Sequence, residues 1–150
     1  SAAPMAQILR RHGAWDRVLV TSFRDAYRRR FFGFVEEPRS TIASSAGVET
    51  VAALLLAHRI GRLTTAVRRL RKRIPFHAIQ VPVRKGPVRV VTKPFVEACH
   101  RAGIAVHVWV VNEQEEMERL LAMGVDGLVT DSGAALSEVL GARGQWPQRR

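Results

Sequence analysis

Polar and aromatic side chains lie at the ends of short apolar runs along this sequence. They are Ser22, Phe23, Gln80, Trp109, Asn112, Thr130 and Asp131. In parallel α/β folds, ligands bind at the carboxyl ends of the strands, so these residues are expected to face one shared mouth. The pattern predicts a substrate pocket, and its candidate residues are Trp109, Gln80, Ser22 and Phe23.

The titratable residues are not arranged like a metal site. Four acids, Glu113, Glu115, Glu116 and Glu118, fall in one predicted helix. They lie close to its start, where the macrodipole favours negative charge, so an exposed helix start is a better interpretation than a metal cage. The five histidines are His12, His58, His77, His100 and His107. His107 alternates with Trp109 along one run, which predicts that both point to the same side, into the barrel. His107 is interpreted as a hydrogen-bonded core histidine, with a catalytic role as the alternative. The lone Cys99 is predicted to be buried and structural.

These residues are carried by strands and helices that alternate along the chain. The predicted helices are 4–12, 23–32, 48–60, 94–102, 113–123 and 133–140, and the predicted strands are 17–22, 40–44, 78–81, 106–111 and 127–130. The strand runs are continuously apolar, which is typical of parallel strands that helices cover on both faces. Asn112 is predicted to cap the helix that follows it, with Glu115 three residues on. Thr130 and Asp131 are predicted to cap the last helix, and Asp126 to brace a turn. Five βα units indicate an α/β fold, either a barrel or a doubly wound sheet.

Two segments interrupt this alternation. Residues 61–75 are polar and basic and predict a short exposed helix followed by a turn. Residues 83–91 contain a Lys-Gly-Pro turn and predict a loop or a small hairpin.

The net charge of +11, from 24 Lys and Arg against 13 Asp and Glu, favours anionic partners in general. The run Arg68–Arg73 is interpreted as a solvated face, with substrate steering or docking on acidic phospholipid headgroups as the alternative. Nucleic-acid binding is disfavoured because basic residues do not alternate with aromatic ones in a known reader motif. No apolar stretch of about 18 residues occurs, and residues 1–13 do not resemble a signal peptide. With a single cysteine, a cytoplasmic location is expected.

The segment 103–140 resembles the end of the glycerophosphodiester phosphodiesterase family. There, a strand ending in W-T-V-N leads into a helix, and G-V-D-G-I-x-T-D closes a barrel. The matching residues here are Trp109, Val111, Asn112, Gly124, Val125, Asp126, Gly127, Thr130 and Asp131, and Val110 replaces the usual Thr. Ser22 and Phe23 match a family strand that ends in Ser-Phe, and Gln80 lies in a matching inner strand. The similarity covers most of the chain and is loosest over residues 31–75.

The resemblance implies a partial (β/α)8 TIM barrel of about five C-terminal βα units, over residues 1–141, with a tail at 142–150. It implies a phosphoric diester hydrolase that cleaves glycerophosphodiesters to sn-glycerol 3-phosphate and an alcohol, in lipid and glycerol metabolism. Trp109 would form the apolar wall for the glycerol or alcohol moiety. Asn112, Asp126, Gly127, Thr130 and Asp131 would be a structural motif.

The resemblance also indicates what this sequence lacks. Family members carry an early His-Arg pair, a Glu-x-Asp pair and a further His as metal ligands and acid/base groups, and a later Glu with a Lys two residues on. No residue here stands in such a context. We therefore expect a divalent metal, Ca or Mg, in the complete enzyme, no metal and no catalytic residue in this chain alone, and no activity of the isolated chain.

Two other functions remain open on the sequence. The chain could be a basic α/β binding module for nucleic acid or an anionic membrane. It could also be a half barrel that pairs with a missing N-terminal half, or with itself, because the open edges of a parallel sheet present unpaired hydrogen-bonding groups.

Overall fold

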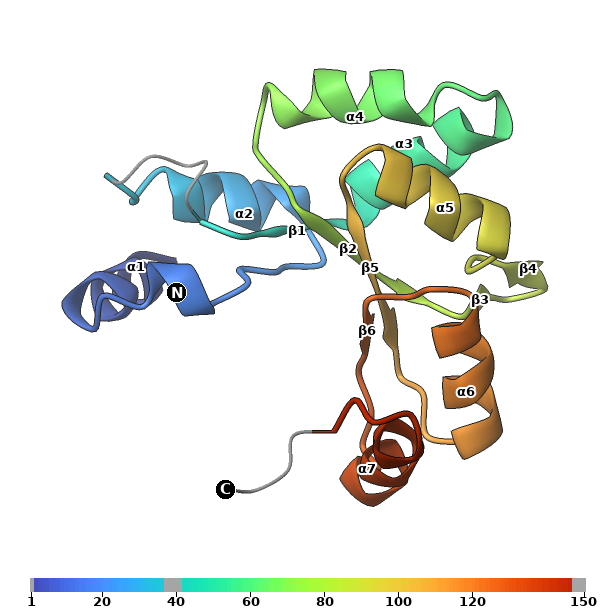
Figure 1. Ribbon diagram of the computed structural model, residues 1–150. Coiled ribbons are helices and arrows are strands. Elements are labelled where there is room, and N and C mark those ends of the chain that lie inside the picture. Colours follow the sequence, from blue (N-terminus) through green and yellow to red (C-terminus); the bar gives the residue numbers. More distant parts are fainter. Residues whose placement is uncertain (1, 37–41, 147–150) are drawn as a thin grey trace. The chain divides into compact units, whose positions relative to one another are not determined.

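A computed structural model describes residues 2–36 and 42–146 and shows an α/β chain with a parallel sheet of four strands, in the order β1-β2-β5-β6 (Figure 1). The α-helices are α1 Ala2–Arg11, α2 Asp25–Phe32, α3 Val48–Arg59, α4 Leu63–Arg71, α5 Lys93–Arg101, α6 Gln114–Ala122 and α7 Gly133–Ala142. The strands are β1 Ser45–Ala46, β2 Ala78–Pro82, β3 Arg84–Lys85, β4 Val88–Arg89, β5 Ala105–Trp109 and β6 Gly127–Leu128. The chain forms two compact units, and strands β2 and β5 contribute residues to both.

The first unit comprises the described residues through Ile79 together with Ala98–Ala105. Val20 forms a parallel bridge with Ser44, and β1 pairs in parallel with the start of β2, with Ser45 opposite Ala78. Apolar residues of α1 and α2 form a core cluster that includes Ala6, Phe31 and Phe32. The rings of Phe31 and Phe32 are buried, and they meet edge to face with their centroids 5.4 Å apart. This cluster anchors α2, whose remaining residues are mostly basic or exposed.

The helices α3 and α4 of the first unit form a hairpin. Leu54 of α3 and Leu63 and Val67 of α4 are buried, since each helix turns its apolar side inward. Gly61 joins the helices with φ +67°, a left-handed conformation that glycine adopts without steric cost. The predicted helix in the basic segment is therefore present as α4, and it carries buried apolar residues as well as basic ones.

The second unit comprises Gln80–Glu97 and the described residues from Val106 onward. Here β5 pairs in parallel with β6, and β3 with β4 forms the predicted small antiparallel hairpin. Helices α6 and α7 lie against one another, and Met117 and Leu120 are the buried residues of α6 (Figure 1). Gly124 follows the C-cap of α6 with φ +89°, the left-handed conformation that glycine commonly adopts just after a helix.

The structure confirms the α/β class and the last three predicted strand–helix units, and it corrects the first two strands. Only Val20 of the predicted strand 17–22 forms a bridge, and Arg17 belongs instead to a 3₁₀-helix, Trp15–Arg17. The second strand begins later than predicted, at Ser45, with Ser44 in the bridge to Val20; residues 40 and 41 of the prediction lie outside the described residues. Among the described residues, no helix is long and apolar enough to cross a bilayer.

Candidate substrate-binding face

Strand β5 separates a buried side from a more open one. Val106 and Val108 are fully buried. His107 and Trp109, which alternate with them along the strand, are half-buried. This alternation has the period of two that a strand imposes on its side chains. The predicted placement of His107 and Trp109 on one side of this strand is therefore confirmed. The peptide bond between Trp109 and Val110 is cis.

The ring of His107 lies directly over Gly127, its partner in the β5–β6 register. A Cβ atom built on Gly127 would be 2.9 Å from the His107 Cδ2 atom and 3.2 Å from its Cγ atom. Such contacts are too close for carbon atoms, so a side chain at this position would displace the imidazole. The second glycine of the G-V-D-G sequence, Gly127, thus leaves room for the ring of His107 on the neighbouring strand.

Asn112 connects the carboxyl ends of β5 and β6. Its Oδ1 atom accepts hydrogen bonds from the Thr130 hydroxyl at 3.0 Å and from the Asp131 backbone N–H at 2.9 Å. The Thr130 hydroxyl in turn accepts the N–H of Ser132 at 2.9 Å. These bonds fix the loop after β6 to the loop after β5.

The predicted capping roles of three of these residues are wrong. Helix α6 has Glu113 at its N-cap position and no side-chain cap, because the Asn112 oxygen is directed to the neighbouring strand end. Helix α7 has Ser132 at its N-cap position, again with no side-chain cap, so neither Thr130 nor Asp131 caps it. A capping signal and a strand-end bridge use the same residue types, and only tertiary structure distinguishes them.

Asp126 joins the amino ends of the same two strands. Its Oδ2 atom accepts the N–H of Val106 at 2.7 Å, and its own N–H donates to the Val106 carbonyl at 2.9 Å. Asp126 therefore braces two strands, whereas the sequence predicted that it braces a turn. Asn112 and Asp126 together hold β5 and β6 in register at both ends.

Gln80, in β2, lies between the buried residues Ile79 and Val81 and is half-buried. Strand β2 neighbours β5 in the sheet order, so the second unit carries Gln80 and Trp109 on adjacent strands. Each of them lies on the more open side of its own strand. Two of the four predicted pocket residues thus lie on neighbouring strands, and a pocket that they line together stays a prediction.

Ser22 and Phe23 belong to the first unit, so a mouth shared with Gln80 and Trp109 remains a prediction. Ser22 is half-buried and its hydroxyl accepts the N–H of Arg24 at 3.3 Å, whereas the Phe23 ring is 69% exposed. Ser22 lines a cavity of about 480 Å³ between α1 and α2, with Thr21, Tyr27 and Arg30 among its walls.

A buried ion pair lies beside this cavity, and the sequence prediction did not include it. Arg28, 2% exposed, donates to the Asp25 carboxylate at 2.5 Å, to the Ser44 hydroxyl at 3.3 Å and to the Pro75 carbonyl at 3.0 Å. An Asp three residues before an Arg at a helix start is the only sequence signal for this pair.

The Asp25 carboxylate also caps a second helix. It accepts the N–H of Gly47 at 3.0 Å and of Thr50 at 2.9 Å, so it takes the place of an N-cap side chain for α3. Burial alone would raise the pKa of Asp25, but hydrogen bonds from Thr50 and Gly47 and the charge of Arg28 hold it below its ordinary value. Conversely, Glu49 of α3 accepts the N–H of Asp25 at 3.0 Å. Each helix therefore supplies a carboxylate to the first turn of the other.

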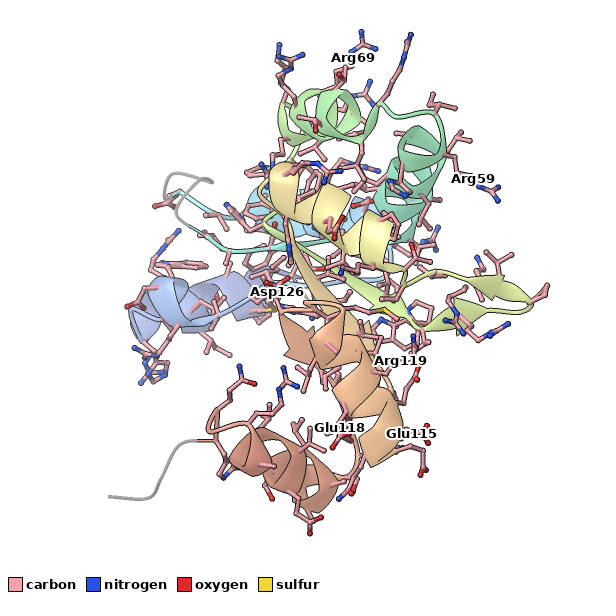
Figure 2. All side chains as sticks on the ribbon, turned by 45° about the vertical axis from the view of Figure 1, so that its right-hand side comes forward. Arg59, Arg69, Glu115, Glu118, Arg119 and Asp126 are labelled. Atoms are coloured by element: carbon pink, nitrogen blue, oxygen red, sulfur yellow. The ribbon has the colours of Figure 1, made fainter. Side chains whose placement is uncertain are left out.

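The acidic residues of the second unit do not form a metal cage. Glu116 binds Arg119 through both carboxylate oxygens, and this hydrogen bonding lowers its pKa. Glu115 and Glu118 extend from α6 into solvent (Figure 2). Among the described residues, no three His, Cys, Asp or Glu side chains gather closely enough to hold a metal ion. The residues that the structure describes therefore do not fit the divalent cation that the resemblance implies.

Comparisons with known proteins agree with the motifs. The sequence pattern of the Glycerophosphoryl diester phosphodiesterase family matches residues 3–134. A Mycobacterium tuberculosis protein named "Probable glycerophosphodiester phosphodiesterase 2" is 38% identical over 143 residues, which is 95% of this chain and 52% of that protein. A glycerophosphodiester phosphodiesterase of Caldanaerobacter subterraneus is 42% identical over 41 residues, 27% of this chain and 17% of that protein.

A solved structure supports the fold. The crystal structure of a glycerophosphodiester phosphodiesterase from Parabacteroides distasonis matches with a TM-score of 0.62 at 19% identity, over 96% of this chain and 51% of that one. The chain thus spans about half the length of the Mycobacterium tuberculosis relative and of this structure.

Proposed function

Because the chain belongs to the glycerophosphoryl diester phosphodiesterase family, we propose that it forms the later half of a metal-dependent enzyme that hydrolyses glycerophosphodiesters to sn-glycerol 3-phosphate and an alcohol. The proposal includes a cytoplasmic location and the absence of activity in the isolated chain. It is supported most directly by the family match, which runs from residue 3 to residue 134 and includes both strand-end motifs.

The residues of this chain are proposed to bind and position the substrate. Trp109, half-buried on the open side of β5, would form an apolar wall for the carbon atoms of the glycerol or alcohol moiety. Gln80, on the adjacent strand, would form hydrogen bonds with hydroxyl groups. The Asn112 bridge and the Asp126 bridge would keep the wall rigid, since they fix β5 against β6 at both ends.

The remaining requirements are proposed to be met outside this chain. Hydrolysis of a phosphodiester needs positive charge against the nonbridging oxygens and a proton for the leaving alkoxide. A Ca or Mg ion would supply the first in the complete enzyme. The described residues offer no cluster of carboxylates for it, so its ligands and the acid/base groups would come from an N-terminal half barrel, supplied by the rest of the protein or by a partner.

An assay of glycerophosphocholine hydrolysis tests this division of labour. The chain is assayed alone with Ca or Mg, and again after mixing or fusion with the N-terminal half of a family member. We expect sn-glycerol 3-phosphate to be released only in the presence of the N-terminal half. Metal-dependent turnover by the 150 residues alone would refute the assignment of the ligands to another segment.

A substitution in the reconstituted enzyme tests the substrate-binding role. Trp109→Ala is expected to raise KM for glycerophosphocholine, because it removes the apolar wall, while Trp146→Ala serves as the matched control at a partly exposed tryptophan. Equal kinetics for Trp109→Ala and Trp146→Ala would contradict the placement of the pocket.

A further inference from the structure

The positive charge of this protein is concentrated in one part of the sequence. Between Thr50 and Val96 there are eleven Lys and Arg residues and no Asp or Glu. The other residues together carry equal numbers of basic and acidic side chains, because the net charge of the whole chain is also +11. Any anionic partner of this protein is therefore expected to meet this segment.

In the first unit, this segment forms the hairpin of α3 and α4. Its exposed basic and large apolar residues, which we call the basic hairpin surface, are Leu56, Arg59, Ile60, Arg62, Arg68, Arg69, Lys72 and Arg73. Leu56 and Ile60 are 65% and 63% exposed, although the hairpin buries other apolar residues such as Leu54 and Leu63. Arg59 and Arg69 extend outward from the two helices (Figure 2). Large apolar side chains thus stand in solvent beside a set of cations.

This surface is not accounted for by the stability of the hairpin itself. Arg68 of α4 and Lys72 at its C-cap are four residues apart, a spacing at which like charges destabilise a helix by about 0.2–0.5 kcal/mol per pair. The macrodipole favours cations in the last turn of α4. It does not favour Arg62, which is the N-cap residue at the opposite end of that helix. An external anion would offset these repulsions.

One basic residue of the hairpin does have a structural role, which sets it apart from the others. The Arg71 guanidinium donates to the carbonyl oxygens of Phe76, Ala102 and Gly103, at 2.9, 3.2 and 2.7 Å. It is half-buried and connects α4 to the end of α5 within the first unit. Arg71 is therefore not a member of the basic hairpin surface.

We propose that the basic hairpin surface docks the protein on an anionic phospholipid bilayer. Six cations without a neighbouring acid in the sequence attract anionic headgroups, and Leu56 and Ile60 add the apolar side chains that enter the boundary between headgroups and acyl chains. Nucleic acid is a poorer fit, because single-stranded binding uses aromatic stacking platforms and no Phe, Trp or Tyr occurs between Thr50 and Pro75. The surface thus resembles a peripheral membrane contact in both its charge and its apolar residues.

Vesicle flotation tests the proposal with the full 150-residue chain. Phosphatidylcholine vesicles with phosphatidylglycerol are expected to carry the protein, and vesicles of phosphatidylcholine alone are not. The replacement of Arg62, Arg68, Arg69 and Lys72 by Gln is expected to lower the partition coefficient about 100–1,000-fold, since each cation near such a surface adds about 1 kcal/mol, or about fivefold. Leu56→Gln with Ile60→Gln is expected to lower it about 10-fold or more on the same vesicles.

A matched control removes four exposed cations outside the acid-free segment, through Arg11→Gln, Arg29→Gln, Arg30→Gln and Arg101→Gln. This variant has the same net charge as the first and is expected to retain most of the binding. Equal losses in the two variants would show a general charge effect and would overturn the proposal. Salt-sensitive binding to duplex RNA together with no binding to anionic vesicles would overturn it as well. Thermal unfolding of each variant verifies that the fold is intact.

Discussion

Replacement of Asp25 by Ala is expected to lower the free energy of unfolding by about 3–5 kcal/mol, because it leaves a buried charge without its partner. Arg28 is 2% exposed and Asp25 6%, so water cannot replace the lost carboxylate. The same carboxylate accepts the N–H groups of Gly47 and Thr50, and the loss of a helix cap costs about 0.5–2 kcal/mol. Since domains of this size are stable by about 5–15 kcal/mol, the change would be a large fraction of the total.

The Asn variant separates charge from shape. Asp25→Asn retains one acceptor oxygen but removes the negative charge opposite Arg28, so its cost is expected to be smaller than that of Ala and to depend on pH. The pKa of Asp25 is lowered in the folded state from an ordinary value of 3.8. Its contribution to stability is therefore complete above pH 3.8 and is lost as the pH falls through the lowered pKa. The difference in stability between wild type and Asp25→Asn should shrink in acid.

Urea denaturation, followed by circular dichroism at several pH values, measures both effects. The control is Asp16→Ala, an exposed aspartate in the same unit, which is expected to change the free energy of unfolding by less than about 0.5 kcal/mol. A loss below about 1 kcal/mol for Asp25→Ala would refute the reasoning, as would parallel pH profiles for wild type and Asp25→Asn. Either result would mean that the ion pair contributes no net stability to the fold.

Three further substitutions test other contacts by urea or thermal denaturation. Gly127→Ala is expected to cost about 1–3 kcal/mol by overpacking against His107, and His107→Ala in the same chain should recover part of it; no recovery would contradict the assigned clash. Asn112→Ala is expected to cost about 1–3 kcal/mol, because the N–H of Asp131 and the hydroxyl of Thr130 lose their acceptor; a cost like that of the exposed control Gln7→Ala would argue against the bridge. Arg71→Met should destabilise the first unit by about 1–3 kcal/mol through three lost hydrogen bonds, whereas Arg69→Met should be neutral.

Local sequence patterns predicted the helices of this protein better than its first two strands. The helix over Val48–Arg59 and the stops at Gly61 and Gly124 follow from local rules, because glycine at a helix end and an apolar periodicity act within a few residues. The strand expected at 17–22 is reduced to one bridge at Val20, since pairing depends on a neighbour that is distant in sequence.

The site residues divide in the same way. Trp109 and His107 lie on one side of β5 as the alternation predicted, because a strand imposes a period of two on its side chains. The role of Asn112 was predicted wrongly, because the sequence shows a capping residue type but not the strand end that lies opposite. The pair of Asp25 and Arg28 was not predicted, since its burial depends on residues of α3 and on Pro75.

The sequence alone determined the α/β class, the family motifs and the acid-free basic segment, because periodicity, residue types and charge are properties of the chain itself. Tertiary structure decided which acceptor each polar side chain uses: Asn112 joins two strand ends, Asp126 pairs with Val106, and Asp25 caps a helix more than twenty residues away. The physical reason is that a hydrogen bond requires its partners within about 3 Å, and for residues distant in sequence only folding brings them that close.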